Sequence, residues 1–171
     1  ERGFSHLMSL KSLTMTDCPK VSWPSSMTED DVLPTSLQEV EIFACGDNTM
    51  GFFLPMTMLQ KLTSLGQLTI SGDTLDMAVG FREFTSLTSL EIVDGSQLND
   101  TTLSTCLQGL TSLRSLSIDS CPLITILSIC LTTLEELSIT SCEELTSLGC
   151  LDALVCLKYL TISWCPKLLP W

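Results

Sequence analysis

The sequence has little positive charge and almost no histidine. Its 171 residues include 8 Lys and Arg against 20 Asp and Glu, giving a formal net charge of −12, and a single His. Binding to nucleic acid or to an anionic membrane surface requires clustered cations, so this composition argues against both partners. The longest apolar stretches are short and are interrupted by Pro, Thr and Ser, so we predict no membrane span.

Motifs for catalysis and for cofactor or metal binding are absent from the sequence as well. It contains no G-x-S-x-G, G-x-G-x-x-G or G-x-x-x-x-G-K-[ST] motif and no C-x-x-C pair. Nucleophile elbows, phosphate-binding loops and zinc sites are built on such patterns. We therefore predict that the chain is not an enzyme, binds no cofactor and holds no metal.

The nine cysteines form an odd set, which does not suit the paired disulfides of a secreted scaffold. This count favours a reduced, cytoplasmic environment. The first residue is Glu1, and no basic and apolar leader precedes the first apolar motif. We interpret the sequence as part of a longer chain.

One motif, L-x-x-L-x-I/M-x-x-C, recurs along the sequence, as in LTSLRSLSIDSCP, LTTLEELSITSCE and LVCLKYLTISWCP. Successive copies are 21 to 28 residues apart, which is the spacing of leucine-rich repeats. The first leucines of the copies are Leu10, Leu37, Leu65, Leu87, Leu113, Leu134 and Leu157. The pattern predicts one domain over residues 1–171 with an α/β solenoid fold. We expect a leucine-rich-repeat horseshoe with a parallel concave β-sheet of about seven strands and irregular or short helical convex segments.

Apolar residues at two places in each repeat predict the core. Within the motif they alternate with polar residues, which indicates one short strand per repeat with one face buried. A second apolar residue precedes each first leucine by three positions and closes the core from the convex side; these residues are Leu7, Leu62, Phe84, Leu110, Leu131 and Leu154. We predict short helices within residues 73–84 and 99–109, starting near Ser or Thr, and enlarged loops over residues 24–36 and 48–57, where Phe52 and Phe53 fill the core.

A cysteine recurs where each strand ends, eight residues after the first leucine. This position holds Cys18, Cys45, Asp73, Gly95, Cys121, Cys142 and Cys165. We interpret the five thiols as buried structural groups beneath the turn. Of the other cysteines, we expect Cys130 and Cys156 to be small core residues and Cys106 and Cys150 to be partly exposed.

Strand residues that point away from the core form the concave face, which we predict to be the binding surface. Most of these positions carry Ser or Thr. We therefore expect the acidic, aromatic and apolar residues among them to mark where a partner binds. The predicted partner-binding residues are Glu39, Glu41, Phe43, Glu91, Val93, Asp94, Asp119, Glu136, Tyr159 and Trp164. Acidic residues outnumber basic ones on and beside these strands, which favours a partner with a basic surface.

Structural alternatives remain open for some of these residues. Phe43 and Val93 can serve cross-strand packing alone. Trp164 can cover the end of the stack together with Leu168, Leu169 and Trp171. A catalytic or cation site can be imagined from four carboxylates, although we interpret them as solvated surface; they are Glu135, Glu136, Glu143 and Glu144.

The runs LRSLSIDSCPLI and LKYLTISWCPKL, with a weaker copy at LKSLTMTDCPKV, resemble a known family. They are similar to the C-terminal repeats of plant intracellular nucleotide-binding leucine-rich-repeat disease-resistance proteins, especially those of grasses. The resemblance implies a recognition module for defence. Its expected partner is a pathogen effector, a guarded host protein or the basic surface of the receptor's own nucleotide-binding module, which such repeats help to autoinhibit.

Three other functions remain alternatives. Plant F-box proteins also carry cysteine-containing repeats, so the chain can be the substrate-recognition part of a ubiquitin-ligase adaptor. It can also be a stand-alone leucine-rich-repeat scaffold. An enzyme with a carboxylate site at Glu135 or Glu136 is the third alternative.

Overall fold

The computed structural model describes residues 4–21, 33–45, 59, 61–74, 81, 84–149 and 151–169. Within these residues, seven five-residue strands carry the fold, accompanied by two short strands, one α-helix and three 3-10 helices. In chain order the elements are η1 (Phe4–His6), β1 (Ser12–Thr16), β2 (Glu39–Phe43), β3 (Gln67–Ser71), η3 (Gly72–Thr74), β4 (Ser89–Val93), α2 (Asp100–Leu107), β5 (Ser115–Asp119), β6 (Ile126–Leu127), β7 (Glu136–Thr140), β8 (Ser147–Leu148), η4 (Leu151–Ala153) and β9 (Tyr159–Ser163).

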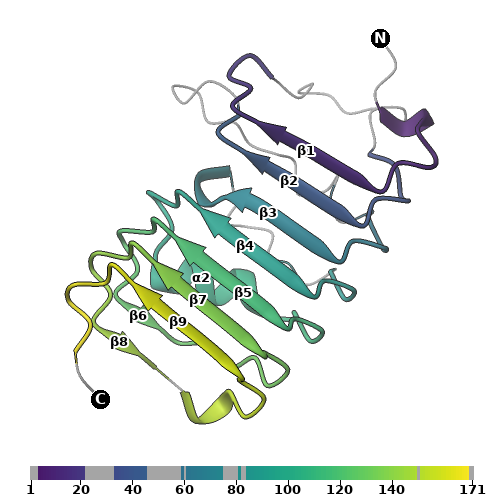
Figure 1. The fold of residues 1–171 in the computed structure, drawn as a ribbon. Helices are drawn as coiled ribbons and strands as arrows, with labels where there is room; N and C mark the ends of the chain where they lie inside the picture. Colours follow the sequence, from purple (N-terminus) through teal and green to yellow (C-terminus); the bar gives the residue numbers. More distant parts are fainter. Residues whose placement is uncertain are drawn as a thin grey trace.

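The seven longer strands form one parallel sheet in the order β1-β2-β3-β4-β5-β7-β9. In Figure 1 they step down the molecule in sequence order with all arrows pointing the same way. Each repeat adds one strand and returns behind the sheet, where α2 lies. The predicted leucine-rich-repeat solenoid with a seven-stranded parallel sheet is confirmed.

The strands stay in register because equivalent residues of successive repeats pair directly. Leu116 pairs with Leu90 on one side and with Leu137 on the other. Just before each strand one carbonyl accepts two amides of the next repeat; Arg114 O, for example, accepts the N–H groups of Glu135 at 2.7 Å and Glu136 at 2.8 Å. This arrangement leaves no room for a one-residue slip, which would turn the buried leucines outward.

The core lies between this sheet and the return segments. The predicted convex residues Leu62, Phe84, Leu110, Leu131 and Leu154 are buried, as are the inward-facing residues of β2 to β7. At the two ends of the stack burial falls, because β1 and β9 each have a neighbouring strand on one side only. Leu7 is 38% exposed at one end, and Leu160 of β9 is 43% exposed where the equivalent Leu137 of β7 is 1% exposed.

Two predicted helices have different outcomes. Residues 99–109 contain α2, which confirms the prediction; Thr101 and Thr102 lie in its first turn, and its N-cap is Asn99, whose Oδ1 accepts the N–H of Thr102 at 3.1 Å. Within residues 73–84 the described part holds the end of η3, and residues 75–80, 82 and 83 lie outside it. Most of the two predicted enlarged loops, with Phe52 and Phe53, also lies outside the described residues.

Side chains of the return segments join one repeat to the next. Asp100, at the start of α2, accepts hydrogen bonds from the N–H and the Oγ1 of Thr125 at 2.7 and 2.5 Å and from the N–H of Ile126 at 3.2 Å. The carbonyl of Thr125 in turn accepts the N–H of Thr146 in the following repeat at 2.8 Å. These bonds place β6 and β8 next to each other as a small second parallel sheet.

Candidate protein-interaction surface

Of the five cysteines at the strand ends, Cys45, Cys121 and Cys142 are buried as predicted, whereas Cys18 and Cys165, in the first and last repeats, are half-buried. Each Sγ donates to the carbonyl of the last residue of its own strand, at 3.3 to 3.5 Å. Burial raises the pKa of the Cys121 thiol to about 12 and that of Cys142 to about 11. Since the thiolate is the reactive form, these two thiols are unreactive at neutral pH.

The other cysteines lie differently from the sequence prediction. Cys106 is buried and its pKa is raised to about 11 by burial, because it lies on the inner side of α2. Cys130 and Cys156, expected in the core, are exposed. The prediction was wrong for all three because apolar sequence neighbours do not reveal which way a return segment turns its side chains. Cys150 lies outside the described residues.

The residues of the seven strands that point away from the core form the outward sheet face, which is the concave face predicted from the sequence. On this face Thr14, Glu41, Thr69, Glu91 and Ser117 follow one another across β1 to β5. Thr14 Oγ1 donates to Glu41 Oε2 at 3.2 Å, and Thr69 Oγ1 donates to Glu91 Oε2 at the same distance. Each carboxylate is thus oriented by a threonine of the preceding strand.

The acidic residues of the predicted cluster share a face without touching. Glu39 and Glu41 lie on β2 and Glu91 lies on β4, with β3 between them. Since adjacent strands are about 4.8 Å apart, Glu41 and Glu91 are separated by roughly 10 Å along one row. Among the described residues no Lys or Arg forms an ion pair with these three carboxylates.

Phe43, Val93 and Asp94 lie where β2 and β4 end. Phe43 and Val93 are half-buried, each at the last position of its strand. Asp94 is exposed in the turn after β4, where its φ of 52° is left-handed. The backbone turns at this residue and carries its side chain out of the rows of the sheet.

The remaining candidates lie on the C-terminal half of the sheet. Asp119, at the end of β5, accepts the Oγ of Ser120 at 3.2 Å, and Glu136 accepts the Oγ of Ser115 at 3.4 Å. Tyr159 pairs with Glu136 across β7 and β9 and is 65% exposed.

Trp164 follows β9 in a left-handed turn with φ 56° and is 82% exposed. The alternative that it covers the end of the stack is therefore wrong. Leu168 instead packs against the core, while Leu169 is exposed. The reason is geometric: Trp164 lies one residue past the strand, where the chain turns away from the inward-pointing positions. Trp171 lies outside the described residues.

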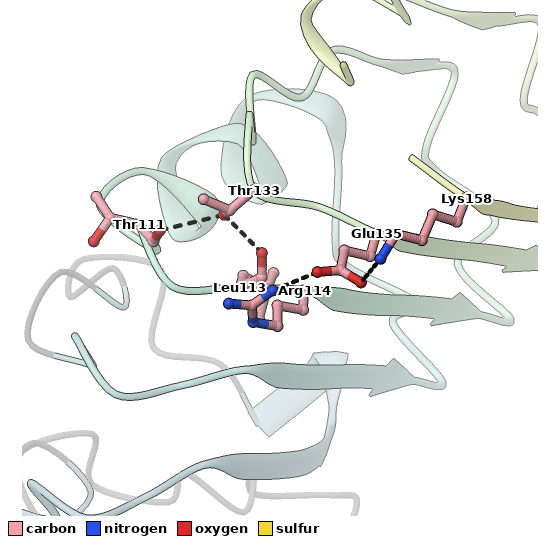
Figure 2. Close-up of polar contacts among 6 residues, drawn as sticks. All are labelled: Thr111, Leu113, Arg114, Thr133, Glu135 and Lys158. Atoms are coloured by element: carbon pink, nitrogen blue, oxygen red, sulfur yellow. Dashed lines mark hydrogen bonds and ion pairs between the residues drawn. The ribbon is translucent and has the colours of Figure 1, made fainter. Parts of the chain in front are cut away.

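Charged residues directly before the N-terminal ends of β5, β7 and β9 form a ladder across three repeats, and Figure 2 shows its side chains. Glu135 forms ion pairs with Arg114 on one side and with Lys158 on the other, the latter at 2.6 Å. Hydrogen bonds from Lys158 and Arg114 lower the pKa of Glu135, and Glu135 raises the pKa of Lys158. Sequence reasoning missed this ladder, although one column of the repeat, read as Arg114, Glu135 and Lys158, alternates in charge.

The four carboxylates considered for catalysis or cation binding are dispersed. Glu135 is held in the ladder, Glu136 accepts from Ser115, and Glu144 pairs with Lys167 at 2.5 Å. Within the described ranges no group of three or more His, Cys, Asp or Glu residues is placed to hold a metal ion. Residues 4–169, where described, contain no helix long and apolar enough to cross a membrane.

Comparisons with known proteins returned no match: no protein-family model fits the chain, and no curated protein is similar to it. The outward sheet face itself is therefore the basis for assigning a function.

Proposed function

We propose that the chain is a protein-recognition module that binds a partner with a basic surface through the outward sheet face. The observation that carries this proposal is the pair of glutamates Glu41 and Glu91, oriented by threonines on one row of a continuous sheet. Carboxylates held in this way are pre-organised to accept hydrogen bonds from Lys or Arg of a partner. Small hydroxyl side chains around them leave the face flat enough for a protein to approach.

Electrostatics support a basic partner. Glu39, Glu41 and Glu91 have no cationic partner among the described residues, whereas Arg114 and Lys158 are both paired with Glu135, which balances one of their two charges. The outward face of β2 to β4 therefore has an uncompensated negative charge. Such a charge steers a basic protein toward the sheet and favours the correct encounter over others.

The biological role that we propose is that of the sensor region of a plant intracellular immune receptor. In this role the partner is a pathogen effector, a guarded host protein or the basic surface of the receptor's own nucleotide-binding module. The proposal rests on the resemblance of the repeats, and two features support it. The eight described cysteines are free thiols, as a cytoplasmic location would require, and the carboxylates of the sheet form no catalytic pair.

The test is a screen of pathogen effectors and host proteins for binding to the chain, followed by measurement of each binder with a variant. The variant Glu39→Lys, Glu41→Lys, Glu91→Lys reverses three exposed or half-exposed charges that make no contact with the core. We expect at least about a ten-fold loss of affinity, mostly through slower association, with unchanged unfolding in urea.

Asp152→Lys is the matched control, because Asp152 is exposed in η4, outside the sheet. It should change affinity by less than about two-fold, since a single rim charge contributes little. Binders that are equally insensitive to both variants would contradict the outward face as the recognition surface.

A further inference from the structure

Besides the outward sheet face, the molecule has an exposed aromatic residue in an unusual backbone position. The residue seven positions after each first leucine has φ between 50° and 56° in six of the seven repeats; these residues are Asp17, Ala44, Asp94, Ser120, Ser141 and Trp164. Small or short polar residues tolerate the left-handed region, whereas a bulky side chain there is an outlier. Trp164 is thus placed where the fold favours a residue such as Ser and where its indole gains no burial, being 82% exposed. Packing within the fold therefore does not explain a tryptophan at this position.

Trp164 lines an open hollow of about 700 Å³ at the exit ends of β7 and β9, the lower strands in Figure 1. Ser141 occupies the equivalent turn of the preceding repeat, and its N–H donates to the carbonyl of Ser163 at 3.0 Å, which holds the two turns side by side. Glu143, Glu144 and Lys167 complete the polar lining. An aromatic face and carboxylates therefore share one concave surface.

The charges in this hollow do not cancel. Lys167 Nζ binds both oxygens of Glu144, at 2.5 and 2.6 Å, so this pair is neutral as a unit. Glu143 is exposed and makes no ion pair within the described part of the chain. One negative charge beside the indole thus remains uncompensated.

We propose that Trp164 and Glu143 bind an arginine side chain of a basic protein segment. A guanidinium group is planar, stacks on an indole face and donates in a fork that matches a carboxylate. The hollow lies just past the C-terminal ends of β7 and β9. A partner segment bound along the outward sheet face can therefore place one side chain in it. This inference rests on the protein-recognition function proposed above. It adds a second contact point at the C-terminal ends of the strands, where an arginine of the partner binds.

The test is a titration, followed by NMR of the tryptophan indole N–H groups, with a Gly/Ser peptide that contains two arginines. Trp164→Phe assigns the indole signal of Trp164 among the three tryptophans of the chain. The arginine peptide should shift this signal. The same peptide with citrulline, which is isosteric and uncharged, should bind at least about ten-fold more weakly because the cation–π and charged contacts are lost.

Two variants identify the binding groups, with peptide affinity measured by isothermal titration calorimetry because Trp164→Ser removes the indole signal. Trp164→Ser introduces the residue found in the two preceding turns, so the fold should be kept while peptide affinity falls about ten-fold. Glu143→Gln should lower it about three-fold, as expected for one exposed charge. Leu169→Ser and Asp152→Asn are matched controls for the loss of exposed apolar surface and of one carboxylate, and each should leave affinity within about two-fold.

The outcomes separate this inference from the proposed function. Equal binding of the citrulline peptide, or unchanged affinity in Trp164→Ser, overturns the arginine site whatever the outward face does. Peptide binding that survives reversal of Glu39, Glu41 and Glu91 but is lost in Trp164→Ser supports a separate contact point. If the charge-reversed variant alone loses the peptide, arginine binds on the outward face and the proposed site in the hollow is wrong.

Discussion

The seven strands of the sheet end in two kinds of turn. The thiol turns follow β1, β2, β5, β7 and β9, where a cysteine Sγ satisfies a carbonyl of its own strand. The glycine turns follow β3 and β4, at Gly72–Asp73 and Asp94–Gly95. There the Asp73 carboxylate reaches into the next repeat and accepts the Oγ of Ser96 at 2.9 Å and the N–H of Gln97 at 3.0 Å.

The difference lies in what each turn depends on. In a thiol turn the cysteine donates to a carbonyl of its own strand, and backbone bonds such as Ser141 N–H to Ser163 O join it to the next repeat. The glycine turns lack the thiol donor and leave less space between neighbouring repeats. A Cβ on Gly72 would lie 2.5 Å from the Cα of Gly95, and a Cβ on Gly95 would lie 2.8 Å from the Sγ of Cys121. The glycine turns therefore leave no space for a Cβ against the next repeat, and stability should be sensitive to atoms added there.

The largest effect is expected at the glycine turns. Gly72→Ala places a methyl group against backbone that cannot move without displacing the next repeat. We expect a loss of about 3 kcal/mol in the free energy of unfolding, the upper range for overpacking. Urea denaturation measures this loss.

Gly66→Ala is the matched control for this variant, because its Cβ would meet Gln38 O at 3.7 Å, an ordinary contact. Its stability should stay within about 0.5 kcal/mol of the parent. Equal stability of the two alanine variants would show that the close approach of the glycine turns is not a constraint.

An intermediate effect is expected within the thiol turns. Cys121 is fully buried beside Gly95, whereas Cys18 is only half-buried near the end of the sheet. Cys121→Ala removes packing and one of the two hydrogen bonds that the carbonyl of Asp119 accepts, the other coming from the N–H of Asp94, which should cost about 2 kcal/mol, against less than about 1 kcal/mol for Cys18→Ala. Thermal or urea unfolding of both variants checks the ranking.

A double variant sharpens the same comparison. In Gly95→Ala the new methyl group would clash with the Cys121 thiol, so adding Cys121→Ala should relieve part of the strain. We expect the double variant to lose about 1 kcal/mol less than the sum of the single losses. Strict additivity would mean that the two kinds of turn are energetically independent.

The smallest effect is expected at the other end of the strands, where Glu135 joins Arg114 and Lys158 on the surface. Because these partners lower the pKa of Glu135, the stabilisation is present above its ordinary value of 4.5 and is lost as pH falls through the lowered pKa. Glu135→Gln should therefore be slightly less stable than the parent at pH 7, and the difference should shrink as the pH falls below 4.5. The midpoints of urea denaturation over a pH series test this, and a difference that does not shrink with falling pH would contradict it. High salt should also diminish the difference at pH 7.

Much of the fold could be predicted because the repeat imposes local rules. The alternation of Leu116 and Ile118 with polar residues predicts a strand with one buried face, and a single repeat unit cannot bury that face alone. Stacking in parallel follows. The structural role of the cysteines at the strand ends follows too, because their position relative to the strand is the same in all five copies that contain one.

The sequence by itself thus determined the strands, their parallel order, the inward leucines and the rows of outward residues. Only the tertiary structure decided how neighbouring repeats use the positions that the repeat leaves free. Cys106 is buried and Cys130 exposed because the return segments turn their side chains according to what packs beneath them. The tertiary structure likewise decided that Glu41 faces Thr14 and that Glu143 shares a hollow with Trp164. These contacts join residues about one repeat apart, so their partners depend on the lateral register and backbone approach of two repeats rather than on the pattern within either one.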